Sequence, residues 1–130
     1  MTVVNPSGLA FPRGYSNGLI LGPGRVLFVA GQIAWDAQAR IVSDDFVAQF
    51  AQAIANVVAV VREAGGAPHH VGQLTIFLKD KEVYLARKKE VGSVYREAMG
   101  KHFPTMALVQ VADLLDEGAQ VEIQAIAVLP

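Results

Sequence analysis

The chain has 130 residues, of which 52% are hydrophobic and 18% charged, with a formal net charge of -1. This length suits a single domain over residues 1–130, and the near-neutral charge argues against nucleic acid as a partner, because nucleic-acid binding depends on clustered Lys and Arg. The absence of cysteine excludes disulfides, thiolate nucleophiles and cysteine-ligated zinc. No uninterrupted apolar run approaches the roughly 20 residues of a membrane span, so we expect a cytoplasmic protein with no membrane partner.

The N-terminal third predicts an irregular lead-in followed by strands. Prolines and glycines punctuate the first 18 residues. Apolar runs at 19–21 and 26–30 flank the sequence Gly22-Pro23-Gly24-Arg25, which predicts two strands joined as a hairpin. Ile41-Val42 is expected to add a short strand.

Two helices are predicted, each next to a strand. Apolar residues recur at spacings of three and four from Phe46 to Val61, after an acidic helix start at 43–45 and before a stop at Gly65-Gly66. A strand is expected at 74–78 and a second helix at 82–99. Two further strands are expected at 105–111 and 121–128, joined by an acidic turn.

The order β-β-α-β-α-β-β predicts an α+β fold, in which both helices pack on one face of a single sheet. The segments 26–29 and 74–78 are nevertheless apolar at consecutive positions, so both faces of these strands require burial. The chain has no further element to cover the second face. We therefore expect an obligate symmetric oligomer, stabilised by ~1.5–3 kcal/mol for each large apolar side chain that it buries.

Four segments, in the same order and spacing, resemble the Rid/YjgF family of reactive imine deaminases, also known as endoribonuclease L-PSP. They are Phe28–Ile33, Ala51–Gly65, Thr75–Asp80 and Val121–Ala127. The resemblance implies a chorismate-mutase-like fold with a mixed β-sheet, and a homotrimer with small-molecule clefts between its subunits. It also implies hydrolysis of enamines and imines, such as 2-aminoacrylate, to a 2-keto acid and ammonia without a metal or organic cofactor.

The resemblance also assigns roles to individual positions. It makes Glu122 the catalytic residue that positions the attacking water, and it places Tyr15, Ala30 and Gly31 in the substrate pocket. Ala30 replaces a usual serine, although its backbone groups could still serve. Three further substrate-binding positions depart from the family pattern: Met106 replaces the arginine that pairs with the substrate carboxylate, Leu108 replaces a polar residue, and Gly92 replaces an asparagine.

The missing arginine leaves two interpretations of the pocket. Either another cation receives the carboxylate, with Arg13, Arg25 and Lys101 as the candidates, or the pocket prefers an apolar or aromatic ligand. His102 is a minor candidate for proton transfer. The adjacent pair at 69–70 follows a helix stop and is expected to be a solvated loop rather than a metal site.

Three functions follow from these observations. The first is a divergent Rid-type hydrolase acting on an enamine, an imine or a related small metabolite, with Glu122 placing the water. The second is a non-catalytic trimer that binds or responds to a small molecule and has lost the arginine. A ribonuclease or translation inhibitor is a distant third.

Overall fold

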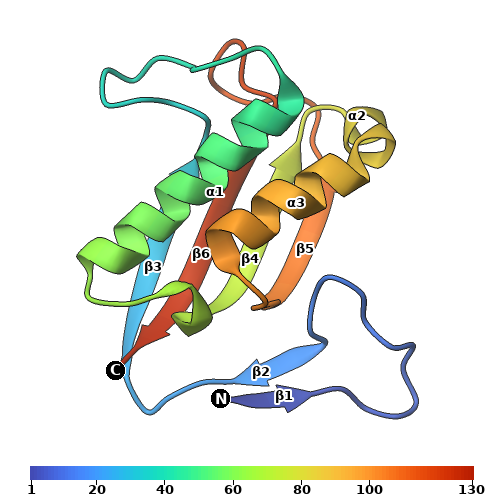
Figure 1. Cartoon of the computed structure of the whole chain (residues 1–130), viewed down its shortest axis with the longest axis vertical. Coiled ribbons are helices and arrows are strands. Elements are labelled where there is room, and N and C mark those ends of the chain that lie inside the picture. Colours follow the sequence, from blue (N-terminus) through green and yellow to red (C-terminus); the bar gives the residue numbers. More distant parts are fainter.

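A four-stranded mixed sheet forms the centre of the molecule (Figure 1). The computed structural model describes all of residues 1–130. The strands lie in the order β3-β6-β4-β5, and their bounds are Arg25–Gln32 for β3, Val71–Leu78 for β4, Thr105–Gln110 for β5 and Val121–Leu129 for β6. β6 is antiparallel to both of its neighbours, whereas β4 and β5 are parallel. β3 and β5 are therefore the two edges of the sheet.

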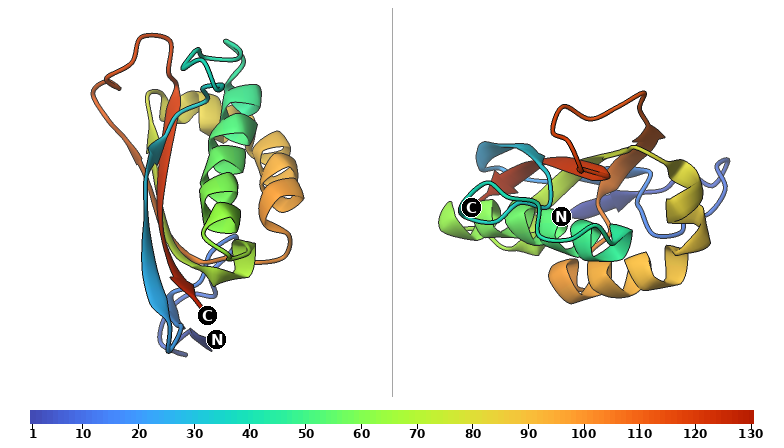
Figure 2. Two further views of the ribbon diagram at one scale, coloured as in Figure 1. Left: turned by 90° about the vertical axis from the view of Figure 1, so that its left-hand side faces the viewer. Right: turned by 90° about the horizontal axis from the view of Figure 1, so that it is seen from above.

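The two long helices, α1 (Phe46–Glu63) and α3 (Lys88–Met99), lie on the same face of this sheet (Figure 2). The predicted α+β architecture with a mixed sheet is thus confirmed. The core fills the space between α1 and the sheet, where Phe50, Ile54 and Leu74 are almost completely buried. A short 3-10 helix, Pro68–His70, leads from α1 into β4.

α1 begins and ends where the sequence predicts. The Asp45 carboxylate accepts a hydrogen bond from the Ala48 N–H at 2.9 Å, which satisfies one of the free donors at the start of the helix. Gly65, at φ 93°, follows its end in a conformation that glycine adopts without strain. α1 is long and apolar enough to span a membrane, but half of it is buried, as in the core helix of a globular domain.

The second predicted helix is interrupted, because α2 (Lys81–Ala86) ends at Arg87 before α3 begins. The Arg87 backbone has φ -123° and ψ 26°, outside the helical region. Its guanidinium donates to Asp45 at 2.6 Å and to Glu90 at 2.7 Å, and this contact lowers the pKa of both carboxyls. The Arg87 side chain thus links the junction between α2 and α3 to the start of α1. Helical periodicity in the sequence does not reveal such a long-range contact.

The predicted N-terminal hairpin is wrong. β2 (Gly18–Ile20) pairs with β1 (Thr2–Val4), a strand that the sequence did not predict, and β3 pairs with β6. β2 forms a separate two-stranded sheet with β1, whereas β3 takes the edge of the four-stranded sheet next to β6. The expected strand at 41–42 is reduced to a single bridge between Trp35 and Ile41.

The face of the sheet opposite the helices is apolar and has no helix over it (Figure 2). On this face Phe28 is 72% exposed, Val26 55% and Val109 43%. Register places Phe28 beside Ile126, and Val26 beside Val128. The expectation that one chain leaves this face uncovered is therefore correct.

Candidate functional site

Glu122 lies near the start of β6, and its carboxylate packs directly against the backbone of Gly31 on β3. A Cβ atom added to Gly31 would overlap the Glu122 carboxylate, so the glycine makes room for it. Glu122 is half-buried and takes part in none of the four ion pairs of the chain. A carboxylate in this position can accept a hydrogen bond from a ligand or a water.

A β-bulge shapes the strand opposite Glu122. Val29 pairs with Ala125 and Gln32 with Ile123, so β3 contains one more residue than β6 over this stretch, and the extra residue falls at Ala30-Gly31. The Gln32 side-chain amide donates to the Ala30 carbonyl at 3.3 Å. Bulges at sheet edges commonly redirect residues next to binding sites. The structure thus brings three of the predicted positions, Ala30, Gly31 and Glu122, to one place.

Met106 and Leu108 belong to a different cavity, between β5 and α3. It has a volume of about 150 Å³, and its lining includes Gly14, Tyr84, Gly92 and the ring of Phe103. Met106 and Leu108 pair with Leu74 and Ile76 on β4 and pack against the core cluster, so their apolar side chains form the floor. This size suits a metabolite smaller than a typical drug.

The N-terminal segment closes one side of this cavity. The Ser16 hydroxyl donates to the Phe103 carbonyl at 2.6 Å, and the Ser16 N–H donates to the Pro104 carbonyl at 3.1 Å. These bonds attach the segment to the start of β5 and bring Gly14 to the cavity wall. Tyr15, 39% exposed, lies between these two positions in the chain, next to the cavity but not in its lining.

The two groups of predicted residues lie on opposite sides of the sheet within one chain. Glu122 pairs with Phe77 of β4, whereas Met106 pairs with Leu74. Leu74 and Phe77 are three residues apart, and side chains of a strand alternate between faces, so these positions point to opposite faces. No single chain can therefore bring Glu122 and Met106 into the same pocket.

None of the predicted substitute cations lines the cavity, and two unpredicted ones do. Arg25 donates to the Pro130 carbonyl at 3.4 Å, at the opposite end of β6 from Glu122, and Arg13 and Lys101 are exposed outside the lining. Lys88 and Arg96 of α3 line the cavity instead. A charged residue on a helix surface carries no signal of its own in the sequence, so finding these two required knowledge of how α3 packs over β5.

His102 has a structural position. Its ring Nε2 lies 2.6 Å from the Val71 carbonyl, to which it donates, and the Tyr95 hydroxyl donates to the His102 carbonyl at 2.8 Å. Burial raises the pKa of Tyr95, which keeps this hydroxyl protonated. These bonds connect α3 to the ends of β4 and β5, and they give no support to a role of His102 in proton transfer.

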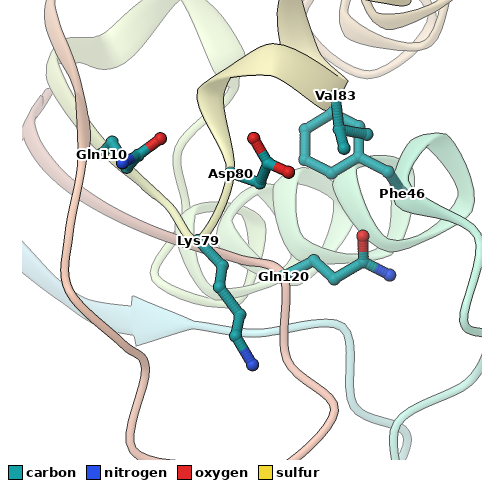
Figure 3. Close-up of a pocket in the computed structure, with 6 residues that line it drawn as sticks. All are labelled: Phe46, Lys79, Asp80, Val83, Gln110 and Gln120. Atoms are coloured by element: carbon teal, nitrogen blue, oxygen red, sulfur yellow. The ribbon is translucent and has the colours of Figure 1, made fainter.

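A further cavity of about 390 Å³ opens where α2 meets the ends of the strands (Figure 3). Its polar side chains already have partners. Asp80 accepts from the Glu82 N–H at the start of α2, Gln110 accepts from the Lys81 N–H, and Gln120 donates to a loop carbonyl. These bonds join loops to the sheet, so we assign this cavity a structural role. No group of three His, Asp or Glu side chains forms a metal site elsewhere in the chain.

Comparison with known proteins decides the family. A family model described as endoribonuclease L-PSP matches residues 8–129. The chain belongs to the Rid/YjgF family. A RutC family protein of Synechocystis is 34% identical over 100% of this chain and 98% of its own length. A goat protein named 2-iminobutanoate/2-iminopropanoate deaminase is 33% identical over 80% of this chain and 73% of its own.

Solved structures of the Rid/YjgF family share the fold. A Rid family protein of unknown function from Yersinia pestis has a TM-score of 0.87 and 28% identity, with 98% of each chain covered. The Escherichia coli protein TdcF, solved with bound serine, has a TM-score of 0.69 and 28% identity, with both chains fully covered. The mixed sheet with helices on one face is therefore the family fold.

Proposed function

We propose that this Rid/YjgF protein is a hydrolase that removes ammonia from a small imine or enamine without a metal or organic cofactor, in the cytoplasm, with Glu122 as the catalytic base. The main support is the half-buried carboxylate of Glu122, which has no ionic partner and is held against the glycine of a bulge. Relatives named as imine deaminases support the reaction class.

The reaction needs one water and no redox step. The imine first takes up a proton from the medium. The water oxygen then bonds to the carbon of this iminium while Glu122 takes one of the water protons, which gives a neutral carbinolamine. The proton then passes to the nitrogen, the carbon–nitrogen bond breaks, and ammonia leaves. The hydroxyl proton returns to the medium and a 2-keto acid remains. An enamine enters the same route after it takes up a proton at carbon to become the iminium.

We place the reaction in clefts between the subunits of a homotrimer. The uncovered apolar face around Phe28 supplies a surface for self-association. Because Glu122 and the cavity over Met106 lie on opposite sides of the sheet, a cleft that uses both takes Glu122 from one subunit and the cavity from its neighbour. A small molecule, rather than nucleic acid, is the ligand that this arrangement favours.

Ammonia release from enzymatically generated 2-aminoacrylate tests the proposal. We expect the protein to accelerate release above the uncatalysed rate, and Glu122→Gln to reduce this acceleration roughly 100-fold, as loss of a general base does. Glu117→Gln removes the same negative charge from an exposed turn outside the site. This variant should release ammonia at the rate of the unchanged protein. Equal rates for the two variants, or no acceleration at all from 2-aminoacrylate or any other imine tested, would refute the assignment.

A second function, non-catalytic binding of a small molecule by the same trimer, is favoured by Met106 and Leu108. Their side chains give the cavity an apolar floor in place of the family's arginine and polar residue. Saturable ligand binding that is unchanged in Glu122→Gln, without turnover of any imine, would favour this function over hydrolysis.

A further inference from the structure

Three positions on α3 form a line above the cavity. Lys88, Gly92 and Arg96 are four residues apart, which places them on one face of the helix, and all three line the cavity. At ~1.5 Å per residue the two cationic positions are separated by about 12 Å along the axis, with the glycine between them. The cations therefore flank the open centre of the cavity roof.

Arg96 occupies the space that the glycine leaves. A Cβ atom at Gly92 would lie 3.3 Å from Nη1 of Arg96 and 4.0 Å from its Cζ. The guanidinium thus folds back over Gly92, in the direction that helix side chains lean. A large side chain at position 92 would displace it.

The charges of Lys88 and Arg96 are not neutralised within the chain. All four ion pairs involve other residues, and the carboxylate of Glu90, near Lys88 in the sequence, is taken by Arg87. Below them the floor of Met106 and Leu108 offers no acceptor side chain. The cavity therefore combines a cationic roof with an apolar floor.

We propose that Arg96 is the specificity-determining cation of this cavity, and that it binds the carboxylate of a small aliphatic acid whose carbon chain rests on Met106 and Leu108. Lys88 adds positive charge at the other end. A guanidinium binds a carboxylate through two parallel hydrogen bonds, whereas the floor residues have only apolar surface to contribute. The inference rests on the proposed function in one respect, namely that the bound acid is the substrate. It explains how a chain with Met106 can still bind an acid.

The test uses butyrate as the probe and butyramide as its uncharged counterpart, titrated into the full-length protein and followed by NMR chemical shifts. Arg96→Gln should weaken butyrate binding roughly tenfold, a modest value for a charge-assisted contact open to solvent, and leave butyramide binding unchanged. Arg62→Gln, an exposed arginine of α1 outside the cavity, is the matched control and should bind both as the unchanged protein does. Gly92→Leu should weaken butyrate binding as well, because the leucine side chain displaces the Arg96 guanidinium without removing its charge from the protein.

Butyrate binding that is equal in Arg96→Gln and Arg62→Gln, or undetectable in the unchanged protein, would overturn the inference. The result is independent of turnover. Arg96-dependent butyrate binding in a protein that hydrolyses no imine would support the carboxylate site and refute the hydrolase. Imine hydrolysis that depends on Glu122 but not on Arg96 would support the hydrolase and overturn the role given to Arg96.

Discussion

Replacing Phe28 with serine should dissociate the proposed homotrimer. The Phe28 side chain is 72% exposed in the single chain and lies on the apolar face opposite the helices. Full burial of such a side chain contributes up to ~3 kcal/mol, so covering the exposed part contributes about 2 kcal/mol per subunit. The three subunits together lose about 6 kcal/mol of association free energy, which lowers the trimerisation constant by roughly four powers of ten.

Sedimentation equilibrium at micromolar concentration measures this effect. Phe11→Ser is the matched control, because Phe11 is 84% exposed but lies in the loop between β1 and β2, outside the four-stranded sheet. We expect the unchanged protein and Phe11→Ser to sediment as trimers, and Phe28→Ser as a monomer. A stable monomer for the unchanged protein, or the same association constant for both variants, would show that the apolar face is not the interface.

Three further predictions concern α3 and its surroundings. Tyr95→Phe should lower the free energy of unfolding in urea by about 1–2 kcal/mol, because it leaves the buried His102 carbonyl without its donor; no change would mean that the bond is weak. Burial, and to a lesser extent the neighbouring histidines, lowers the pKa of His70 below 6.5, and its neutral Nδ1 accepts from the Ala67 N–H. The folded state therefore favours neutral His70, so stability should fall as the pH drops below about 6.5; His70→Gln should lack this component of the pH dependence, and an unaltered profile would contradict the assignment. Gly92→Ala should raise the melting temperature, because alanine favours a helix interior over glycine by up to ~1 kcal/mol; a lower value would indicate that the position tolerates no side chain.

The predictable parts of the fold were those fixed by local patterns. The apolar spacing of α1, its acidic start and its glycine stop are contained in one stretch of sequence, and they gave correct bounds to within about two residues. The pairing of β2 with β1 was missed, because it joins residues 14 to 18 positions apart and competes with a nearer strand. The break at Arg87 is likewise accompanied by a contact with Asp45, which is 42 residues away.

The candidate site shows the same limit. Family resemblance indicated Glu122, and the structure adds that Gly31 makes room for its carboxylate. The sequence order suggested Arg13, Arg25 and Lys101 as cations near the pocket, whereas helix packing brings Lys88 and Arg96 there. The buried side of the whole helix decides which face of α3 lies over β5, and a charged residue at the border of that side shows no pattern of its own.

The separation of Glu122 from Met106 by the thickness of the sheet has a consequence for how such a protein changes over time. Different neighbours surround the two residues, so a substitution beneath α3 can alter ligand preference while the acidic group by the bulge stays undisturbed. Recognition and chemistry are thereby free to evolve separately. Under the proposed function, Met106 at the position where the family resemblance implies an arginine changes how a ligand is held beneath α3 and leaves the carboxylate of Glu122 in place.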